Sequence, residues 1–292
     1  MRSYNSMTLV SIKPLKTKAP FVTAIIAAHN EEIHLANCIE SLLNQTYKKM
    51  EIFIIENGES NDKTLNIAQS YQKKYPSRVK AFTIKGKQKG PGPAWNYGII
   101  HAKGELVMIC GADLRYGADY VSKGIVPIVN GKSVGIVHLE ELCNNTSNLW
   151  ARAFFYKRSS VYRNNNSRVF SIIKKSYVKA RPFNSELGYS DDQTIYLSEG
   201  TEFQCIDLKV NHTNPASFAD TWSHSLWVGR SIHKSWQLIA IIPIFPLYAL
   251  YKTITHLKID FYIPFIFFLP YYYSIRYWAY TLVAIKEIFR KV

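Results

Sequence analysis

Acidic and amide side chains follow several strand-like segments of this 292-residue chain, at the points where those segments end. The run Glu105–Cys110 leads straight into Gly111-Ala112-Asp113, which predicts a carboxylate at the carboxyl end of a strand. Ligands of open α/β sheets bind just beyond these ends. In a strongly basic chain, Asp113 is therefore a candidate ligand for a metal-bound diphosphate. A second acid two residues earlier would strengthen this interpretation, but that position is Gly111.

Two further polar turns follow the first two predicted strands. Ala28-His29-Asn30-Glu31-Glu32 follows one, and Glu56-Asn57-Gly58, with Asp62 shortly after it, follows the other. An acidic side chain here could accept hydrogen bonds from a ribose or a nucleobase, and Gly58 permits a tight turn. The alternative is an ordinary strand-to-helix turn, which prefers the same residue types.

The segment Lys85–Gly98 combines glycines, lysines such as Lys89, and the start of a predicted helix. Glycines allow close backbone approach, and free N–H groups at a helix start favour phosphate. The segment is not a Walker loop, because no Gly-Lys-Ser/Thr ends it.

Two acids and a histidine lie further along the chain. Asp191 and Asp192 open a predicted helix, and their mutual repulsion tends to raise one pKa, as a general base requires. Capping of that helix explains the same pair equally well. His212 follows the strand-like run Phe203–Val210, where a structural role competes with metal binding.

These residues need a scaffold of alternating strands and helices, which predicts an α/β fold with a mostly parallel sheet and helices on both faces. Asn30 is expected to cap the first helix, with Glu31 and Glu32 at its positive end. The predicted elements are strand Phe21–Ala28, helix Glu31–Gln45, strand Glu51–Ile55, helix Asp62–Tyr75, strand Val79–Ile84, helix Pro93–Ala102 and strand Leu106–Cys110.

Composition limits the partners. The net charge of +15 favours an anionic partner such as a phosphate ligand, a nucleic acid or an acidic membrane surface. No recognised nucleic-acid motif occurs, so nucleic acid is not an expected partner. The four cysteines form no Cys-x-x-Cys pair, which argues against a zinc site and favours a reducing compartment. Residues 1–20 lack a continuous apolar core and do not resemble a signal peptide.

Two later regions point to a membrane. Residues 142–185 are basic and aromatic, which fits either a solvated helical face or a surface facing lipid phosphates or an anionic acceptor. Trp236–Tyr251 and Phe261–Ile275 are uncharged, and interfacial aromatics accompany them. A helical pair at the membrane is expected, spanning or lying on it, although a soluble hairpin is the alternative. Basic flanks at both ends predict a cell-membrane location with the catalytic domain facing the cytoplasm.

In order and spacing, residues 21–230 resemble a family 2 glycosyltransferase with the GT-A (Rossmann-like) fold. The tail is then 1–20, the GT-A domain 21–235 and the membrane-associated hairpin 236–292. The motifs that carry the resemblance are Ala28-His29-Asn30-Glu31-Glu32, Glu56-Asn57-Gly58 with Asp62 and Thr64, Gly92–Gly98, Ala102–Glu105, Ala112-Asp113, Asp191-Asp192, His212 and Trp227-Val228-Gly229-Arg230.

The resemblance implies an inverting transfer of a sugar from a nucleoside-diphosphate sugar to an acceptor. Asp113, with His212, would hold Mg²⁺ or Mn²⁺ on the diphosphate, and Asp192, beside Asp191, would deprotonate an acceptor hydroxyl. The remaining matched residues would bind substrate; they are Ala28, Asn30, Glu31, Glu56, Asp62, Lys89, Asn96, Arg115 and Arg230.

The chain departs from the family at the metal motif. The family's Asp-x-Asp has become Gly111-Ala112-Asp113, and Arg115 stands where polyprenyl-phosphate sugar synthases have Gln. Arginine cannot ligate a cation but can pair with a diphosphate, which predicts a weakened metal site. Glu56 also replaces the more usual Asp.

The predicted function is a membrane-attached glycosyltransferase whose acceptor is a lipid-linked saccharide or a polyprenyl phosphate. Membrane lipids are then a further partner. The alternative is a catalytically inactive relative that binds sugar nucleotide or lipid, which Gly111 favours. A third hypothesis, based on charge alone, is a basic protein that binds membrane surfaces or nucleic acid.

Overall fold

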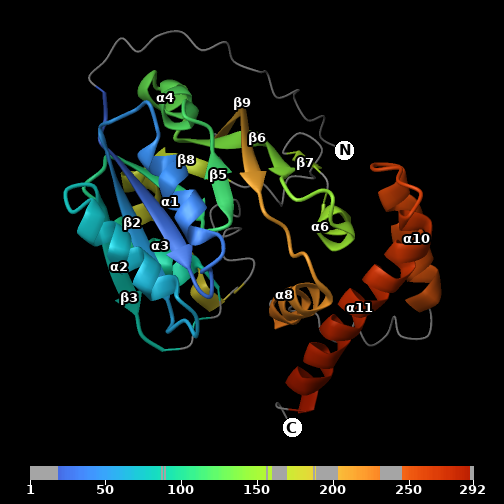
Figure 1. Ribbon diagram of the computed structural model, residues 1–292. Coiled ribbons are helices and arrows are strands. Elements are labelled where there is room, and N and C mark those ends of the chain that lie inside the picture. The colour runs from blue at the N-terminus through green and yellow to red at the C-terminus, as the bar shows by residue number, and fades with distance from the viewer. Residues whose placement is uncertain are drawn as a thin grey trace. The chain divides into compact units, whose positions relative to one another are not determined.

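The computed structural model describes residues 19–86, 88, 90–155, 157–159, 170–186, 188, 203–230 and 245–289 (Figure 1). The chain forms two compact units, one of residues 1–142 with 158–212 and one of residues 143–157 with 213–292. The predicted domain boundary at residue 235 lies outside the described residues and stays a prediction.

The first unit begins with regular strand–helix alternation, as the sequence predicts. Its elements up to the fourth strand are β1 (Val22–Ala28), α1 (Leu35–Leu43), β2 (Met50–Asn57), α2 (Thr64–Lys74), β3 (Val79–Ile84), α3 (Gly92–His101) and β4 (Leu106–Gly111). The remaining elements are β5 (Leu114–Tyr116), α4 (Tyr120–Gly124), α5 (Val126–Val129), β6 (Gly135–Cys143), β7 (Lys157–Ser159), β8 (Phe170–Lys174), α7 (Lys175–Lys179) and β9 (Phe203–His212).

Among the described residues, nine strands form one sheet in the order β3-β2-β1-β4-β8-β6-β9-β5, with β7 beside β6. The strands β1 to β4 pair in parallel, whereas β8 pairs antiparallel with both β4 and β6, and β5 pairs antiparallel with β9. The prediction of a mostly parallel sheet is therefore right only for the first half, and the sheet as a whole is mixed.

Helices cover both faces of the parallel half, as predicted. On one face Ile26 of β1 packs in a buried cluster with Leu35 and Ile39 of α1. On the other face Ile25 packs with Trp95 and Ile99 of α3. Alternate residues of one strand thus fill two cores, which explains why β1 is apolar except at Thr23.

The basic, aromatic region 142–185 contains a strand inside the sheet. Ile172 and Ile173 of β8 are fully buried between β4 and β6. Neither a solvated helical face nor a lipid-facing surface describes β8, because it is a strand whose isoleucines are buried inside the sheet.

The second unit contains α6 (Leu149–Phe154), α8 (Phe218–Arg230), α10 (Phe245–Leu257) and α11 (Phe265–Phe289). Phe265, Leu269 and Tyr272 of α11 form a buried cluster with Ala153 of α6. The helices α10 and α11 also pack on each other, with the rings of Phe245 and Tyr277 stacked 4.2 Å apart.

No helix in the described part of the chain is long and apolar enough to span a membrane. The helix α11 contains Arg276 and Lys286 among many tyrosines. Part of the predicted uncharged segment Trp236–Tyr251 lies outside the described residues. The helices α10 and α11 pack as a pair in the predicted C-terminal region, and their association with a membrane, spanning or interfacial, stays a prediction.

Candidate active site

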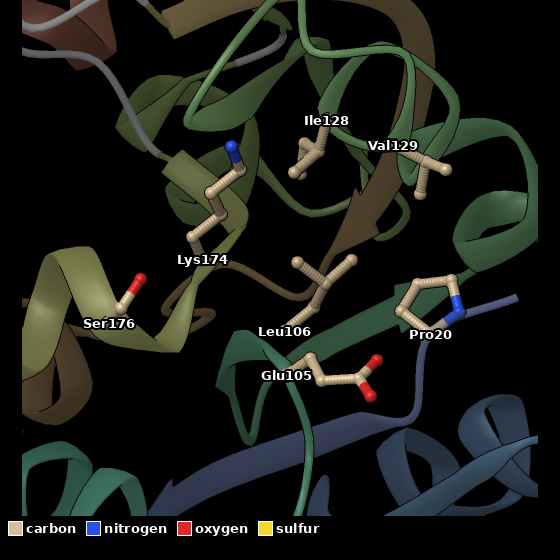
Figure 2. Close-up of a pocket in the computed structure, with 7 residues that line it drawn as sticks. All are labelled: Pro20, Glu105, Leu106, Ile128, Val129, Lys174 and Ser176. Atoms are coloured by element: carbon tan, nitrogen blue, oxygen red, sulfur yellow. The ribbon is translucent and has the colours of Figure 1, made fainter. Parts of the chain in front are cut away.

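A shallow pocket of about 330 Å³ opens at the amino end of β4 (Figure 2). Glu105 lies at its edge and accepts a hydrogen bond from the backbone N–H of Phe21, over 3.1 Å. None of the predicted site residues lines it. The lining residues are Pro20, Glu105, Leu106, Ile128, Val129, Lys174 and Ser176. The pocket is therefore at the wrong end of the strands for the predicted site.

At the opposite edge, the parallel register brings the predicted motifs together. Ala28 lies opposite Glu56, and Ala27 lies opposite Gly111. The turn after β1, the end of β2 and the end of β4 therefore meet at the carboxyl ends of adjacent strands, where α/β sheets bind ligands.

The turn after β1 is not the helix cap that we predicted from Asn30. Asn30 adopts a left-handed backbone conformation (φ 56°), and α1 begins five residues later at Leu35, with His34 at its N-cap. The side-chain oxygen of Asn30 accepts instead from the backbone N–H of Asn61, over 2.8 Å, and its own N–H donates to Ser60. Asn30 thus ties the β1 turn to the β2 turn.

Glu56 is buried near the end of β2, and its carboxylate bonds the turn that follows β2. One carboxylate oxygen accepts from the backbone N–H of Ser60 over 2.9 Å, and the other from the hydroxyl of Thr83 over 3.1 Å. Both oxygens therefore have partners inside the protein. This shows a structural role, and the predicted substrate contact stays a prediction.

Asp62 makes two backbone contacts that join α2 to the β1 turn. Its carboxylate accepts from the N–H of Thr64 (2.9 Å) and from the N–H of Glu32 (3.0 Å). Burial tends to raise the pKa of Asp62, but these hydrogen bonds and one from the Thr64 hydroxyl outweigh it and hold the pKa below its usual range. Thr64 in turn accepts from the backbone N–H of Glu31 over 2.7 Å.

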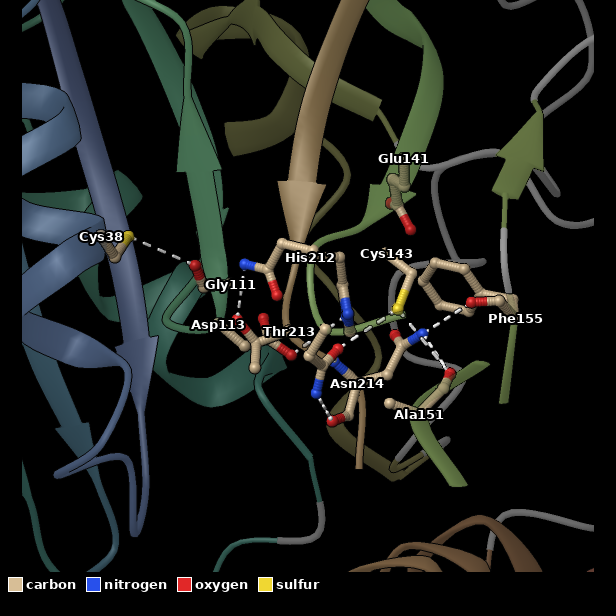
Figure 3. A network of polar contacts seen from close by, with 12 residues as sticks. Cys38, Gly111, Asp113, Glu141, Cys143, Ala151, Phe155, His212, Thr213 and Asn214 are labelled. Carbon is tan, nitrogen blue, oxygen red and sulfur yellow. Dashed lines mark hydrogen bonds and ion pairs between the residues drawn. The ribbon is translucent and has the colours of Figure 1, made fainter. Parts of the chain in front are cut away.

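Asp113 and His212 form an ion pair at the end of β4. The Oδ2 atom of Asp113 lies 3.1 Å from Nε2 of His212 (Figure 3). The antiparallel pairing of β5 with β9 sets Leu114 opposite His212, which brings the imidazole to the neighbouring carboxylate. Burial raises the pKa of Asp113, but the imidazole more than offsets this and the pKa is lowered.

Glu31 adds a fourth acid to this edge, beside Glu56, Asp62 and Asp113. Burial, followed by the negative charges of Asp113 and Asp62, raises the pKa of Glu31 to about 9. Burial and these two negative charges therefore favour the protonated form of Glu31. A bound divalent cation would remove that repulsion, so this edge of the sheet is electrostatically suited to one.

Gly111 leaves space that Asp113 occupies. A Cβ atom at position 111 would lie only 2.7 Å from Oδ1 of Asp113. The backbone carbonyl of Gly111 accepts a hydrogen bond from the buried Cys38 thiol over 3.4 Å. Arg115 is exposed and lies opposite Asn211 in the β5–β9 register, next to the position where Leu114 lies opposite His212.

The side chain of Asn96 is engaged elsewhere. Its amide donates to the carbonyl of Phe183 and accepts from the N–H of Phe183, each over 2.9 Å. This reciprocal pair ties α3 to the chain after α7. The structure gives Asn96 a structural role, and its predicted contact with substrate stays a prediction.

Other predicted residues do not join this edge in the described structure. Lys89, Asp191 and Asp192 lie outside the described residues. Arg230 is the exposed last residue of α8, in the second unit. Their roles stay predictions.

A buried polar group near Asp113 escaped sequence reasoning. His138 of β6 contacts the Tyr120 hydroxyl at 3.0 Å and the Glu141 carboxylate at 3.3 Å, and all three side chains are buried. The charge of Glu141 also acts to raise the pKa of Asp113. The sequence feature that could have indicated this group is one histidine and two acids inside the otherwise apolar run 135–143.

The chain after His212 enters the second unit through Asn214, another residue that we did not predict. Its side-chain amide donates to the carbonyls of Ala151 (2.8 Å) and Phe155 (2.7 Å), as Figure 3 shows. Asn145 bonds the backbone of Asn214 in both directions. Asn214 therefore fixes this connection to both ends of α6.

Comparison with known proteins agrees with this arrangement. The sequence model of "Glycosyl transferase family 2" matches residues 23–194. A GalNAc(5)-diNAcBac-PP-undecaprenol beta-1,3-glucosyltransferase of Campylobacter jejuni is 25% identical over 190 residues, which are 61% of this chain and 59% of that protein. A dolichyl N-acetyl-alpha-D-glucosaminyl phosphate 3-beta-D-2,3-diacetamido-2,3-dideoxy-beta-D-glucuronosyltransferase of Methanococcus voltae is 34% identical over 36% of this chain and 33% of its own length. The chain thus spans from a third to three fifths of the length of these two relatives.

Solved structures share the fold over most of their length. The mannosyltransferase PcManGT of Pyrobaculum calidifontis, in complex with GDP-Man and Mn²⁺, superposes with a TM-score of 0.55 at 16% identity, over 96% of this chain and 92% of that one. S. aureus TarS 1–349 in complex with UDP gives a TM-score of 0.53 at 16% identity, over 93% and 91%. The fold is that of GT-A glycosyltransferases, and the chain belongs to glycosyl transferase family 2.

Proposed function

We propose that the protein transfers a sugar, with inversion, from a nucleoside-diphosphate sugar to a membrane-embedded acceptor, either a lipid-linked saccharide or a polyprenyl phosphate. The observation that carries the proposal is the Asp113–His212 pair at the strand ends, next to Glu31 and the Asn30–Asp62 turns. The undecaprenol- and dolichyl-linked substrates named for the two relatives support a lipid-linked acceptor. The UDP and GDP-Man complexes of the structural neighbours support the donor class.

The residues present fit a divalent cation. Asp113 offers a carboxylate oxygen and His212 an imidazole nitrogen, on side chains that already face each other at 3.1 Å. Among the described residues no group of three His, Cys, Asp or Glu side chains converges on one point. Mg²⁺ and Mn²⁺ accept one or two protein ligands when substrate phosphates complete the shell. When bound, the cation would offset the negative charge that develops on the departing diphosphate.

The chain's own residues would do the rest. The Asn30 and Asp62 contacts hold the two turns that frame the nucleotide, and Arg115 is placed to pair with a diphosphate oxygen. The acceptor oxygen attacks the anomeric carbon while the bond to the diphosphate breaks. For a hydroxyl acceptor, Asp192 would take the proton.

The metal test compares Asp113→Asn and His212→Ala with the wild type in Mn²⁺ binding and in transfer. Both variants should lose Mn²⁺ affinity for the UDP-bound protein by tenfold or more, and transfer should fall by at least a hundredfold, because charge stabilisation at the leaving group is lost. The matched control is Asp119→Asn, an exposed acid paired with Lys123. Full activity in chelator would reject an essential metal.

The acceptor test uses Asp192→Asn. A phosphate acceptor is already ionised and needs no base, so near-normal turnover would favour a polyprenyl phosphate. A loss of a hundredfold or more would favour a hydroxyl on a lipid-linked saccharide.

A second candidate is a catalytically inactive relative that binds sugar nucleotide, which the missing carboxylate at Gly111 favours. Incubating membranes with labelled sugar nucleotides and extracting the lipids separates the two. Labelled lipid supports the enzyme, and nucleotide binding without labelled lipid supports the inactive relative.

We propose further that the protein lies at the cell membrane with its catalytic domain on the cytoplasmic side, as the basic flanks of the C-terminal helices favour.

A further inference from the structure

The connection between α10 and α11 presents large apolar side chains to water. Ile259, Phe261, Ile263 and Phe267 are 80%, 74%, 66% and 81% exposed. With Tyr262 and Ile266, which are also exposed, they form a patch that we call the apolar tip. On α10, an exposed stripe of Leu247, Leu250, Tyr251 and Ile254 repeats at helical spacing. Contiguous exposed apolar surface of this kind marks an interaction site.

The apolar tip is held in place from within the second unit. Asp260 is buried, and its two carboxylate oxygens accept from Nε and Nη2 of Arg152 over 2.7 and 2.6 Å. The backbone N–H groups of Ile259 and Asp260 both donate to the carbonyl of His256. Phe265 donates to the carbonyl of Tyr262 and buries its own ring beneath the turn. The bidentate ion pair and these backbone bonds therefore fix the backbone of the turn that carries the exposed side chains.

Along residues 245–276 the unneutralised charges have one sign. Between residues 245 and 276 the only acid is Asp260, which Arg152 neutralises, whereas Lys252, Lys258 and Arg276 are cationic. Lys258 is exposed beside Ile259, and the ammonium of Lys252 lies 5.5 Å from the ring centre of Tyr248. A second copy of this surface would bring like charges together. An anionic lipid surface complements both the cations and the apolar side chains.

We propose that the apolar tip inserts into the interface of an anionic lipid bilayer, with Lys252 and Lys258 at the headgroups. The contact is interfacial rather than spanning, with the tyrosines at the depth that amphipathic rings prefer. It deepens the proposed function, which needs an acceptor held in lipid, by naming the surface that meets the membrane. Its test needs no sugar transfer.

The first measurement is co-sedimentation of the full chain with vesicles of equal parts phosphatidylglycerol and phosphatidylcholine. The wild type should bind these vesicles and bind pure phosphatidylcholine at least tenfold more weakly. The double variant Phe261→Ser/Phe267→Ser should lose tenfold or more in partition, since two inserted aromatic rings are removed. Lys258→Gln should lose about fivefold, and 0.5 M salt should weaken the wild type.

The matched control is Ile33→Ser/Ile100→Ser, which removes two exposed apolar side chains from the first unit. It should bind the vesicles as the wild type does. If its partition onto the vesicles falls as much as that of the Phe261/Phe267 variant, binding reflects non-specific adsorption of exposed apolar side chains, and the proposal is overturned.

A second measurement guards against misfolded variants. A fluorescent label on Phe261→Cys should shift to the blue on adding the anionic vesicles, and the same label on Ile100→Cys should not. The four native cysteines are buried and should not compete for the label. A label at 261 whose emission does not shift overturns the proposal. Dimerisation in the absence of lipid that the double variant abolishes also overturns it, because the apolar tip would then bind a second copy of the chain.

Failure of the proposed function is distinguishable. Vesicle binding without any sugar transfer would reject the proposed enzyme function and support membrane binding by the apolar tip. Transfer to a short, water-soluble acceptor without vesicle binding would reject membrane binding by the apolar tip and support the proposed enzyme function.

Discussion

Gly111 is the residue at which this site departs most from its family. Its missing side chain gives Asp113 room beside His212, and it also leaves one carboxylate fewer at the edge where Asp113 and Asp62 already repel Glu31. The site therefore has fewer ligands and less negative charge than a pair of aspartates would supply. Metal binding should respond directly to a change at this position.

We expect Gly111→Asp to lower the Mn²⁺ concentration for half-maximal transfer roughly tenfold, because a second carboxylate strengthens cation binding. The new Cβ meets only the end of the Asp113 side chain, at 2.7 Å, which can rotate away. Without metal, the added repulsion should lower the melting temperature. Gly111→Asn has the same shape without the charge, so an equal response of both variants to Mn²⁺ would contradict the idea.

Asp62 allows a pH-dependent test of the turn contacts. Asp62→Asn should destabilise the fold by about 1 kcal/mol at pH 7, since an amide cannot accept from both backbone N–H groups. The pKa of Asp62 is lowered in the folded state, so its stabilisation is present above the unfolded pKa of about 4 and is lost as pH falls through the folded pKa. Urea unfolding at pH 7 and at pH 3 should show the gap between variant and wild type narrowing. A gap that does not change with pH would remove the carboxylate from the explanation.

At the scale of elements, the parallel half of the sheet was predictable and the antiparallel half was not. β1, β2, β3 and β4 lie within a few residues of their predicted positions, since each contains clustered β-branched, aromatic or other apolar residues and alternates with helices that have one apolar face. β5 and β7 have three residues each, too few for any periodicity to show.

The site was predictable to the same extent. The order of motifs placed Asp113, Glu56 and Asn30 at strand ends, and the register confirms their common edge. The grouping of Asp113 with His212 was implied by the family resemblance; no local pattern predicts it, because it depends on which strand pairs with β5. The Asn30 cap failed for a different reason: Asn also favours the left-handed conformation, and Asn61 offered it a partner across the turn.

Gly98 is the element-scale contact most open to test. An added Cβ would lie 2.5 Å from Cγ2 of Ile25 and 3.0 Å from Cδ1 of Ile55, where α3 packs on the sheet. We expect Gly98→Ala to cost roughly 1–3 kcal/mol through overpacking, even though alanine favours a helix by about 1 kcal/mol over glycine. Urea unfolding measures it. Ile100→Ala, on the exposed side of α3, is the control and should change stability by less than about 0.5 kcal/mol; a stabilised Gly98→Ala would show that the core has room.

At the scale of the whole molecule, all four cysteines are free and buried, spread over both units. Burial is the largest influence on each of three thiols and raises the pKa of Cys38, of Cys110 (to about 12) and of Cys143. Thiolates are the reactive form, so both access and ionisation are suppressed.

We therefore expect no thiol to react quickly with Ellman's reagent in the native protein at pH 8, and all four to react in guanidinium chloride. Reductant should leave the melting temperature unchanged. One fast-reacting thiol in the native protein would show that a unit opens locally without global unfolding.

The pairing of β5 with β9 has a consequence for biosynthesis. Asp113 leaves the ribosome early, with β1, β2 and β4, whereas His212 arrives only with the last strand of the sheet. Domains fold from the amino end as they emerge, so the parallel half can form before β9 is made. The Asp113–His212 contact can form only after His212 has been synthesised. A chain that stops before β9 contains the residues of the turns around Asn30 and Asp62 but lacks the Asp113–His212 pair, and with it the proposed metal site.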